Sequence, residues 1–153
     1  MLLGYTAGKY RAETEWELIE NIRLAEQWAA WCWKIGLPVI CPHKNTAHYG
    51  GIMGIPDSVW LEGDLEMIRR CDVLVVMDNW RSSSGTKDEI KLAEELEIPI
   101  FYMPEDSKKL VKWVRSMERA IELAERQCQK QYGMSVEDTY KHISAKRQER
   151  KEK

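Results

Sequence analysis

The chain has 153 residues, which is enough for one ordinary globular domain but not for a second core of useful size. Apolar residues make up 44% and charged residues 31%, which excludes a globally disordered chain. The formal net charge is only −2, so the bulk composition gives no sign of nucleic-acid binding. No apolar run approaches the roughly 20 residues that a membrane helix needs, and we expect a soluble, cytoplasmic protein that does not bind membranes.

Cysteine spacing argues against a metal site, and the charge of the C-terminal end bears on nucleic-acid binding. Four cysteines lie far apart, without a CxxC pair or a histidine at ligand spacing, so we expect reduced thiols and no metal site. Residues 141–153 carry six Lys or Arg and two Glu, a local charge of +4. We interpret this end as solvated rather than as a nucleic-acid contact.

The first half of the chain alternates apolar runs with helical patterns. Thr14 and Glu17 have the spacing of a capping box, which predicts the start of a helix. The expected elements are, in order, a buried strand at 2–6, a helix from 14 to a stop at Gly36, a short strand at 38–42, a loop at 43–56 and a helix at 57–70.

The second half continues the alternation. Residues 72–77 contain five consecutive apolar residues, three of them β-branched, and predict a central parallel strand. The expected elements after it are a polar loop at 78–84, a helix that Gly85 and Thr86 open, a strand at 98–102, a long amphipathic helix from Ser107 to near Gly133, and a basic terminal helix after a second possible capping box at 135–138.

Strands separated by helices of ten or more residues indicate βαβ units and a parallel sheet. We expect a flavodoxin-like or Rossmann-like three-layer α/β sandwich with a four- to five-stranded parallel sheet and extra C-terminal helices. Residues 1–133 would form the α/β domain and residues 134–153 a basic helical extension. In such sheets ligands bind beyond the carboxyl ends of the strands, which selects the loops at 7–13, 43–56, 78–86 and 103–107.

Two of these loops have the composition of anion or sugar sites. Gly8 allows close backbone approach and Arg11 could hold an anion, although a tight turn with a solvated arginine is the more common meaning of this pattern. The run from Ser82 to Thr86 enters a helix start, where free amides favour an anion, and where serine is also an ordinary N-cap. The fingerprints GxGxxG and Walker A are absent, which argues against NAD and ATP.

Carboxylates and aromatic residues flank the same region. Glu89 falls in the first predicted turn of its helix, where a glutamate usually compensates the dipole, and Asp64 lies mid-helix, where aspartate is disfavoured. Together they would allow glycosidic chemistry. His43 could contact a base. Trp80 could stack on a planar ligand or cover the core rim, and we expect the other six tryptophans to fill core and interfaces.

These residues together resemble the nucleoside 2-deoxyribosyltransferase-like superfamily, over about residues 2–102. The similarity is greatest to a domain-of-unknown-function branch related to the nucleoside 5′-monophosphate N-glycosidases. The motifs that carry it are Leu3-Gly4-Tyr5-Thr6-Ala7-Gly8-Lys9-Tyr10-Arg11, Cys41-Pro42-His43, Gly63-Asp64-Leu65, Cys71-Asp72-Val73-Leu74-Val75 and Ser83-x-Gly85-Thr86-x-x-Glu89-Ile90-x-x-Ala93.

The resemblance implies a role for each matching residue. Glu89 would be the nucleophile toward C1′ of the sugar, Asp64 would assist at the sugar and leaving base, and Tyr5 would orient the nucleophile. The substrate- and phosphate-binding residues that it implies are Gly8, Arg11, His43, Ser83, Gly85 and Thr86. It also implies a homo-oligomer, and the reaction needs no cofactor.

The sequence departs from the related monophosphate hydrolases beside the nucleophile. Lys87 replaces a glycine, and its side chain could either obstruct a phosphate or supply a cation to it. Asp88 replaces an apolar residue and would raise the pKa of Glu89 if both face the cleft. We therefore expect cleavage or transfer of the N-glycosidic bond of a (deoxy)nucleoside or nucleoside 5′-monophosphate, with a non-catalytic nucleotide-binding or sensor module as the alternative.

Overall fold

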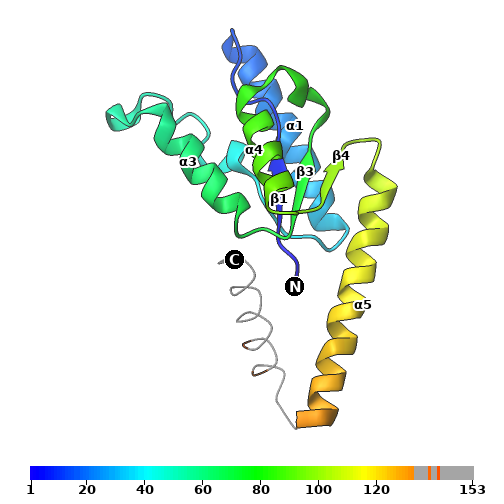
Figure 1. Ribbon diagram of the computed structural model, residues 1–153. Helices are drawn as coiled ribbons and strands as arrows, with labels where there is room; N and C mark the ends of the chain where they lie inside the picture. The colour runs from blue at the N-terminus through cyan, green and yellow to red at the C-terminus, as the bar shows by residue number, and fades with distance from the viewer. Residues whose placement is uncertain (133–137, 139–140, 142–153) are drawn as a thin grey trace. The chain divides into compact units, whose positions relative to one another are not determined.

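The computed structural model describes residues 1–132 together with residues 138 and 141. Its sheet consists of four parallel strands in the spatial order β2-β1-β3-β4 (Figure 1). The strands are β1 (Gly4–Ala7), β2 (Val39–Ile40), β3 (Val73–Val76) and β4 (Ile100–Tyr102). This arrangement confirms the predicted α/β class and the central position of the strand after Asp72.

Within the described residues, five α-helices and two short 3₁₀ turns connect and follow these strands. The helices are α1 (Glu15–Lys34), α2 (Pro42–Asn45), α3 (Asp57–Ile68), α4 (Ser84–Glu95) and α5 (Ser107–Tyr132), and the 3₁₀ turns are η1 (Ile52–Gly54) and η2 (Asp78–Ser82). The predicted capping box is present at the start of α1. The Glu17 amide donates to Thr14 Oγ1 at 3.2 Å, and the Thr14 amide donates to Glu17 Oε2 at 3.3 Å.

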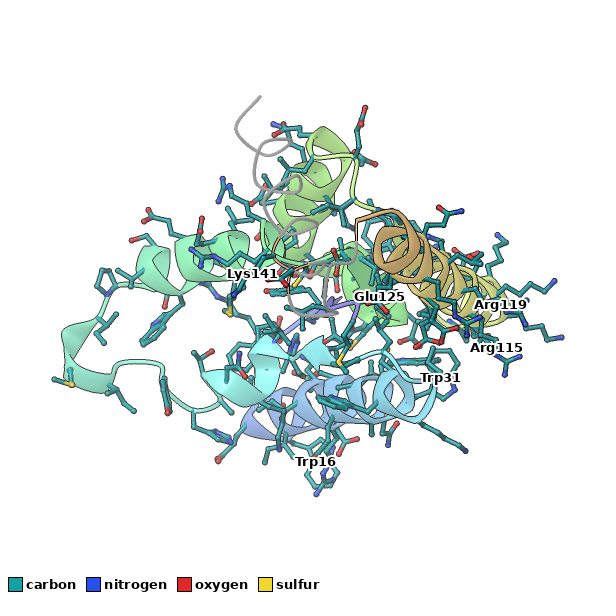
Figure 2. The ribbon with its side chains drawn as sticks, turned by 90° about the horizontal axis from the view of Figure 1, so that it is seen from below. Trp16, Trp31, Arg115, Arg119, Glu125 and Lys141 are labelled. Atoms are coloured by element: carbon teal, nitrogen blue, oxygen red, sulfur yellow. The ribbon has the colours of Figure 1, made fainter. Side chains whose placement is uncertain are left out.

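Helices cover both faces of the sheet, so the domain has the predicted three layers (Figures 1 and 2). On one face, alternate residues of β1 and β3 pack against α3, α4 and the turn that follows α3. This cluster consists of Tyr5, Ala7, Ile68, Cys71, Leu74, Val76, Ile90 and Ala93. Helix α1 covers the opposite face with small side chains, namely Ala25, Ala29 and Cys32. Small residues there let the helix lie close to the strands.

Two sequence predictions need correction. The second strand is shorter than 38–42 because Pro42 begins helix α2, so His43 lies in a helical turn and not in a loop. The tryptophans do not fill the core, since none of them is fully buried. Trp33 is 61% exposed, and Trp16 is 68% exposed and projects outward from α1 (Figure 2). Aliphatic, alanine and cysteine side chains make up most of the core instead.

The chain divides into two compact units, Met1–Val114 and Arg115–Lys153. Leu110 and Val114 of α5 are buried within the first unit, whereas Leu123 in the second is 57% exposed. The second capping box and most of the basic segment lie outside the described residues. Among the residues that are described, no helix combines the length and the apolar character needed to cross a membrane.

Candidate active site

A cleft opens at the carboxyl ends of β1 and β3, where the strand order reverses. This is the position that a parallel α/β sheet offers to a ligand. Its volume is about 320 Å³. It is lined by Gly8, Lys9, Tyr10, Arg11, Pro42, His43, Thr46, Tyr49, Gly50, Asp57, Trp60, Leu61, Asp64, Ser82, Ser83, Ser84, Gly85, Thr86, Asp88 and Glu89. Three of the four predicted loops contribute to the cleft, and the segment 103–107 does not.

A buried tyrosine–glutamate pair lies at the cleft. The Tyr5 hydroxyl donates a hydrogen bond of 2.7 Å to Glu89 Oε1. Tyr5 is fully buried and Glu89 is 9% exposed. The two residues are 84 positions apart in sequence, and only the packing of α4 on β1 brings them together. The Tyr5 bond engages one of the two carboxyl oxygens of Glu89.

The position of Glu89 follows from where α4 begins. Ser83 is the N-cap, because the Thr86 amide donates to its Oγ at 3.2 Å. Glu89 is therefore in the second turn and not in the first, which corrects the expected dipole-compensating placement. Thr86, Glu89, Ile90 and Ala93 are the buried residues of α4 and recur at helical spacing. A glutamate on the buried face of an amphipathic helix requires a polar partner, which Tyr5 provides.

The environment of Glu89 favours its protonated form. Burial raises its pKa to about 8 from an ordinary 4.5, the Tyr5 hydrogen bond lowers it, and the Asp64 carboxylate raises it. Hydrogen bonding from Thr86 also lowers this pKa, and Asp88 raises it. The Thr86 hydroxyl has a single proton and also lies 3.0 Å from Ser83 Oγ, so it serves one acceptor at a time.

Asp64 of α3 supplies a second carboxyl group to the cleft. Burial raises its pKa to about 6. Both Asp64 and Glu89 raise the pKa of Tyr5 further above its ordinary value, after the larger effect of burial. The three side chains thus form one electrostatically coupled group, in which a proton can be held near neutral pH.

The loop after β1 is held against η2. Asn79 Oδ1 accepts the Lys9 amide at 3.1 Å, and Asn79 Nδ2 donates to Asn21 Oδ1 at 3.1 Å. A Cβ at Gly8 would lie 2.8 Å from Asn79 Oδ1 and 2.1 Å from Met77 Cε. The predicted close backbone approach at Gly8 is therefore an approach to the side chains of Met77 and Asn79.

His43 lies beneath the same loop. It is 4% exposed, and its Nε2 is 3.2 Å from the Lys9 carbonyl oxygen. A carbonyl only accepts, so Nε2 carries the proton and Nδ1 has a free lone pair. Among the described residues Nδ1 has no hydrogen-bond partner. Burial lowers the pKa of His43, which keeps the ring neutral at neutral pH.

Arg11 is engaged by an aspartate at the mouth of the cleft. Its Nη2 lies 2.7 Å from Asp57 Oδ2, and the two side chains are 70% and 67% exposed. The pair joins the loop after β1 to the first residue of α3. Sequence analysis identified Arg11 as an anion ligand but not its partner, because an ion pair across 46 positions leaves no local pattern.

Aromatic side chains that sequence analysis did not single out line one part of the cleft. Tyr49 and Trp60 pack edge to face with ring centroids 6.0 Å apart, and Tyr10 packs edge to face on His43 at 5.6 Å. Trp80 does not line the cleft, since it packs on Tyr102 at 5.5 Å and covers the core rim. No group of three metal-ligating side chains converges within the described part of the chain.

Part of the sequence matches a described protein family. Residues 36–102 match the family described as "Domain of unknown function (DUF4406)". This part of the chain is thus similar to that family, which confirms the resemblance to a domain-of-unknown-function branch that its motifs indicate.

One solved structure with a similar fold is a 2-deoxyribosyltransferase from the psychrotolerant bacterium Bacillus psychrosaccharolyticus. Its sequence identity to this chain is 23%, and the TM-score is 0.48. The alignment covers 65% of this chain and 70% of the other. No curated protein matches the sequence.

Proposed function

We propose that this protein cleaves or transfers the N-glycosidic bond of a (deoxy)nucleoside or nucleoside 5′-monophosphate, with Glu89 as the nucleophile. The observation that carries the proposal is the 2.7 Å hydrogen bond from Tyr5 to Glu89 Oε1 at the cleft. It fixes Oε1 of the carboxyl group, and we take the other oxygen, Oε2, as the attacking atom. The motifs around Tyr5, Asp64 and Glu89 support the same roles.

The reaction would proceed by double displacement. Glu89 Oε2 forms a bond to C1′ as the C1′–N bond breaks, and the bonding electron pair leaves with the base. Asp64, with its pKa raised to about 6, is ionised at the pH at which Glu89 is ionised, so it is suited to hold a sugar hydroxyl as a hydrogen-bond acceptor, and the departing base takes its proton from water. Water or a second base then attacks C1′ of the glycosyl ester, and the configuration is retained overall.

Burial of Glu89 serves this chemistry at the transition state. A carboxylate in a partly dry cleft interacts strongly with the positive charge that develops on an oxocarbenium-like sugar. The same burial disfavours the ionised nucleophile in the free protein. We therefore expect activity to rise with pH as Glu89 loses its proton.

Release of free base from a panel of (deoxy)nucleosides and monophosphates, followed by chromatography, tests the proposal. Glu89→Gln should lower turnover by roughly 10³-fold or more, because the amide cannot form the glycosyl ester. Glu95→Gln is the matched control, because it makes the same substitution on an exposed residue of α4 that does not line the cleft. Turnover that is unchanged in Glu89→Gln would eliminate the assignment.

One observation favours a second candidate, a non-catalytic nucleotide-binding or sensor module. Glu89, with a pKa of about 8, is mostly protonated at neutral pH in the free protein and could act as a hydrogen-bond donor to a ligand. Tight nucleoside binding without any released base, and with little change in Glu89→Gln, would favour this candidate. The homo-oligomer expected from the resemblance remains a prediction, which light scattering of the full chain tests.

A further inference from the structure

We propose that the cleft accepts uncharged nucleosides and discriminates against their 5′-phosphates, with Asp57 and Asp88 as the specificity-determining residues. This inference rests on the proposed function, because it takes the sugar to lie with C1′ at Glu89 and its 5′ end toward the start of α4. It selects one of the two substrate classes that the proposed function leaves open.

Arg11 is already neutralised by an ion pair with Asp57. Its guanidinium group lies 2.7 Å from Asp57 Oδ2. A phosphate could use Arg11 only by displacing Asp57 or by approaching that carboxylate. The arginine that would otherwise attract a phosphate is therefore part of a locally neutral pair.

The Ser83 side chain already caps the start of α4. Its Oγ accepts the Thr86 amide at 3.2 Å and lies 3.0 Å from Thr86 Oγ1. That amide is consequently unavailable to a phosphate, because it is satisfied by the cap. The remaining Ser83 hydroxyl proton gives one donor to a ligand, which suits a 5′-hydroxyl group.

The charged side chain that lines the cleft beside this helix start is negative. Asp88 lines the cleft, whereas Lys87 is exposed and does not line it. Lys87, which stands where the monophosphate hydrolases have a glycine, therefore brings no cation to the cleft. Its neighbour brings an anion instead.

The charge balance of the whole cleft has the same sign. Three anionic carboxylates line it, those of Asp57, Asp64 and Asp88, against two basic side chains, Lys9 and Arg11; the fourth carboxyl group, that of Glu89, is mostly protonated at neutral pH. A 5′-phosphate would add a charge of about −2 at neutral pH. Repulsion between like charges in a cleft costs binding energy, and it selects partners by exclusion. An uncharged nucleoside avoids this repulsion.

Paired substrates that differ only in the 5′-phosphate test the inference. We expect kcat/KM for a 2′-deoxynucleoside to exceed that for its 5′-monophosphate by roughly tenfold or more at low ionic strength. Asp88→Asn and Asp57→Asn should each reduce this ratio about threefold to tenfold, the second by freeing Arg11. Comparing the two substrates within each variant cancels any effect of Asp88 on the ionisation of Glu89.

Asp78→Asn is the matched control, because it makes the same charge change on an exposed residue that does not line the cleft. Its ratio should equal that of the unaltered protein. A monophosphate that is used as well as its nucleoside, or a ratio that Asp88→Asn shifts no more than Asp78→Asn, would overturn the inference.

A binding measurement separates this inference from the proposed function. Calorimetric titration of Glu89→Gln with the same nucleoside and monophosphate reads out charge discrimination without turnover. If no base is released by any variant but the nucleoside still binds at least tenfold more tightly, the proposed catalysis fails and the charge discrimination stands. Tighter binding of the monophosphate, or no binding of either ligand, overturns the discrimination itself.

Discussion

A glutamate on the buried face of α4 lowers the stability of the folded protein at neutral and alkaline pH. The folded state holds the Glu89 proton up to a pKa of about 8, against an ordinary 4.5. The folded state therefore binds more protons than the unfolded chain between these values, and the free energy of unfolding falls as pH rises through them. Such a group is retained at the expense of stability when function requires it.

Glu89→Gln should accordingly stabilise the fold in a pH-dependent way. Glutamine cannot ionise, so the Glu89→Gln variant does not lose the stability that the unaltered protein loses when Glu89 ionises. The difference in Tm between Glu89→Gln and the unaltered protein should be small near pH 5 and should increase toward pH 9. Thermal unfolding followed by circular dichroism measures it. A Tm difference that stays constant over this pH range would mean that Glu89 is not buried as described.

Tyr5→Phe should move the pH dependence of activity. The Tyr5 hydrogen bond lowers the pKa of Glu89, so removing the hydroxyl raises that pKa further. Asp64, Thr86 and Asp88, the other groups that act on Glu89, are unchanged. We expect the acidic limb of the kcat/KM profile to move about one unit to higher pH. The Tm of the Tyr5→Phe variant serves as the control that its core remains folded. An acidic limb of the kcat/KM profile that stays in place would contradict the assigned role of Tyr5.

At the scale of elements, the junction of β1 with the following loop positions the cleft. A Cβ at Gly8 would lie 2.1 Å from Met77 Cε and 2.8 Å from Asn79 Oδ1. The methionine end can move, but Asn79 is held by the Lys9 amide and by Asn21. We expect Gly8→Ala to destabilise the protein by about 1–3 kcal/mol.

A double-variant comparison identifies the cause of that loss. If the methionine contact dominates, Gly8→Ala should cost less in a Met77→Ala background than in the unaltered protein, as chemical denaturation can measure. Equal costs in the two backgrounds would assign the loss to Asn79 and the loop. A neutral Gly8→Ala would show that the junction is less tightly packed than described.

Elements and chemistry were predictable from sequence where the signal is local. The capping box at Thr14, the apolar run of β3 and the Ser83 cap are short patterns, and each is present in the structure. The start of α2 was missed because Pro42 reads equally well as the end of a strand or as the first residue of a helix. The tryptophans were misplaced because helical spacing alone does not say which face of α1 is covered.

Long-range pairs explain what sequence reasoning could not reach at the site. The carboxyl ends of parallel strands predicted which loops gather, and the motif resemblance placed Tyr5, Asp64 and Glu89 together. The Asp57 partner of Arg11 and the Asn79 support of Lys9 depend on side-chain contacts across many tens of residues. Such contacts arise from the tertiary structure and have no signature in a single sequence.

At the scale of the whole molecule, the sheet order places the cleft at the switch between β1 and β3, and α3 and α4 bring the carboxyl groups of Asp64 and Glu89 to it. We propose that Glu89 bonds covalently to the sugar. Intact-mass spectrometry after incubation with a slowly turning 2′-fluorinated nucleoside analogue tests it most directly. We predict a mass increase of one fluorinated sugar, on the peptide that contains Glu89, which is absent in Glu89→Gln. Release of base with no adduct, or an adduct on another residue, would contradict the account.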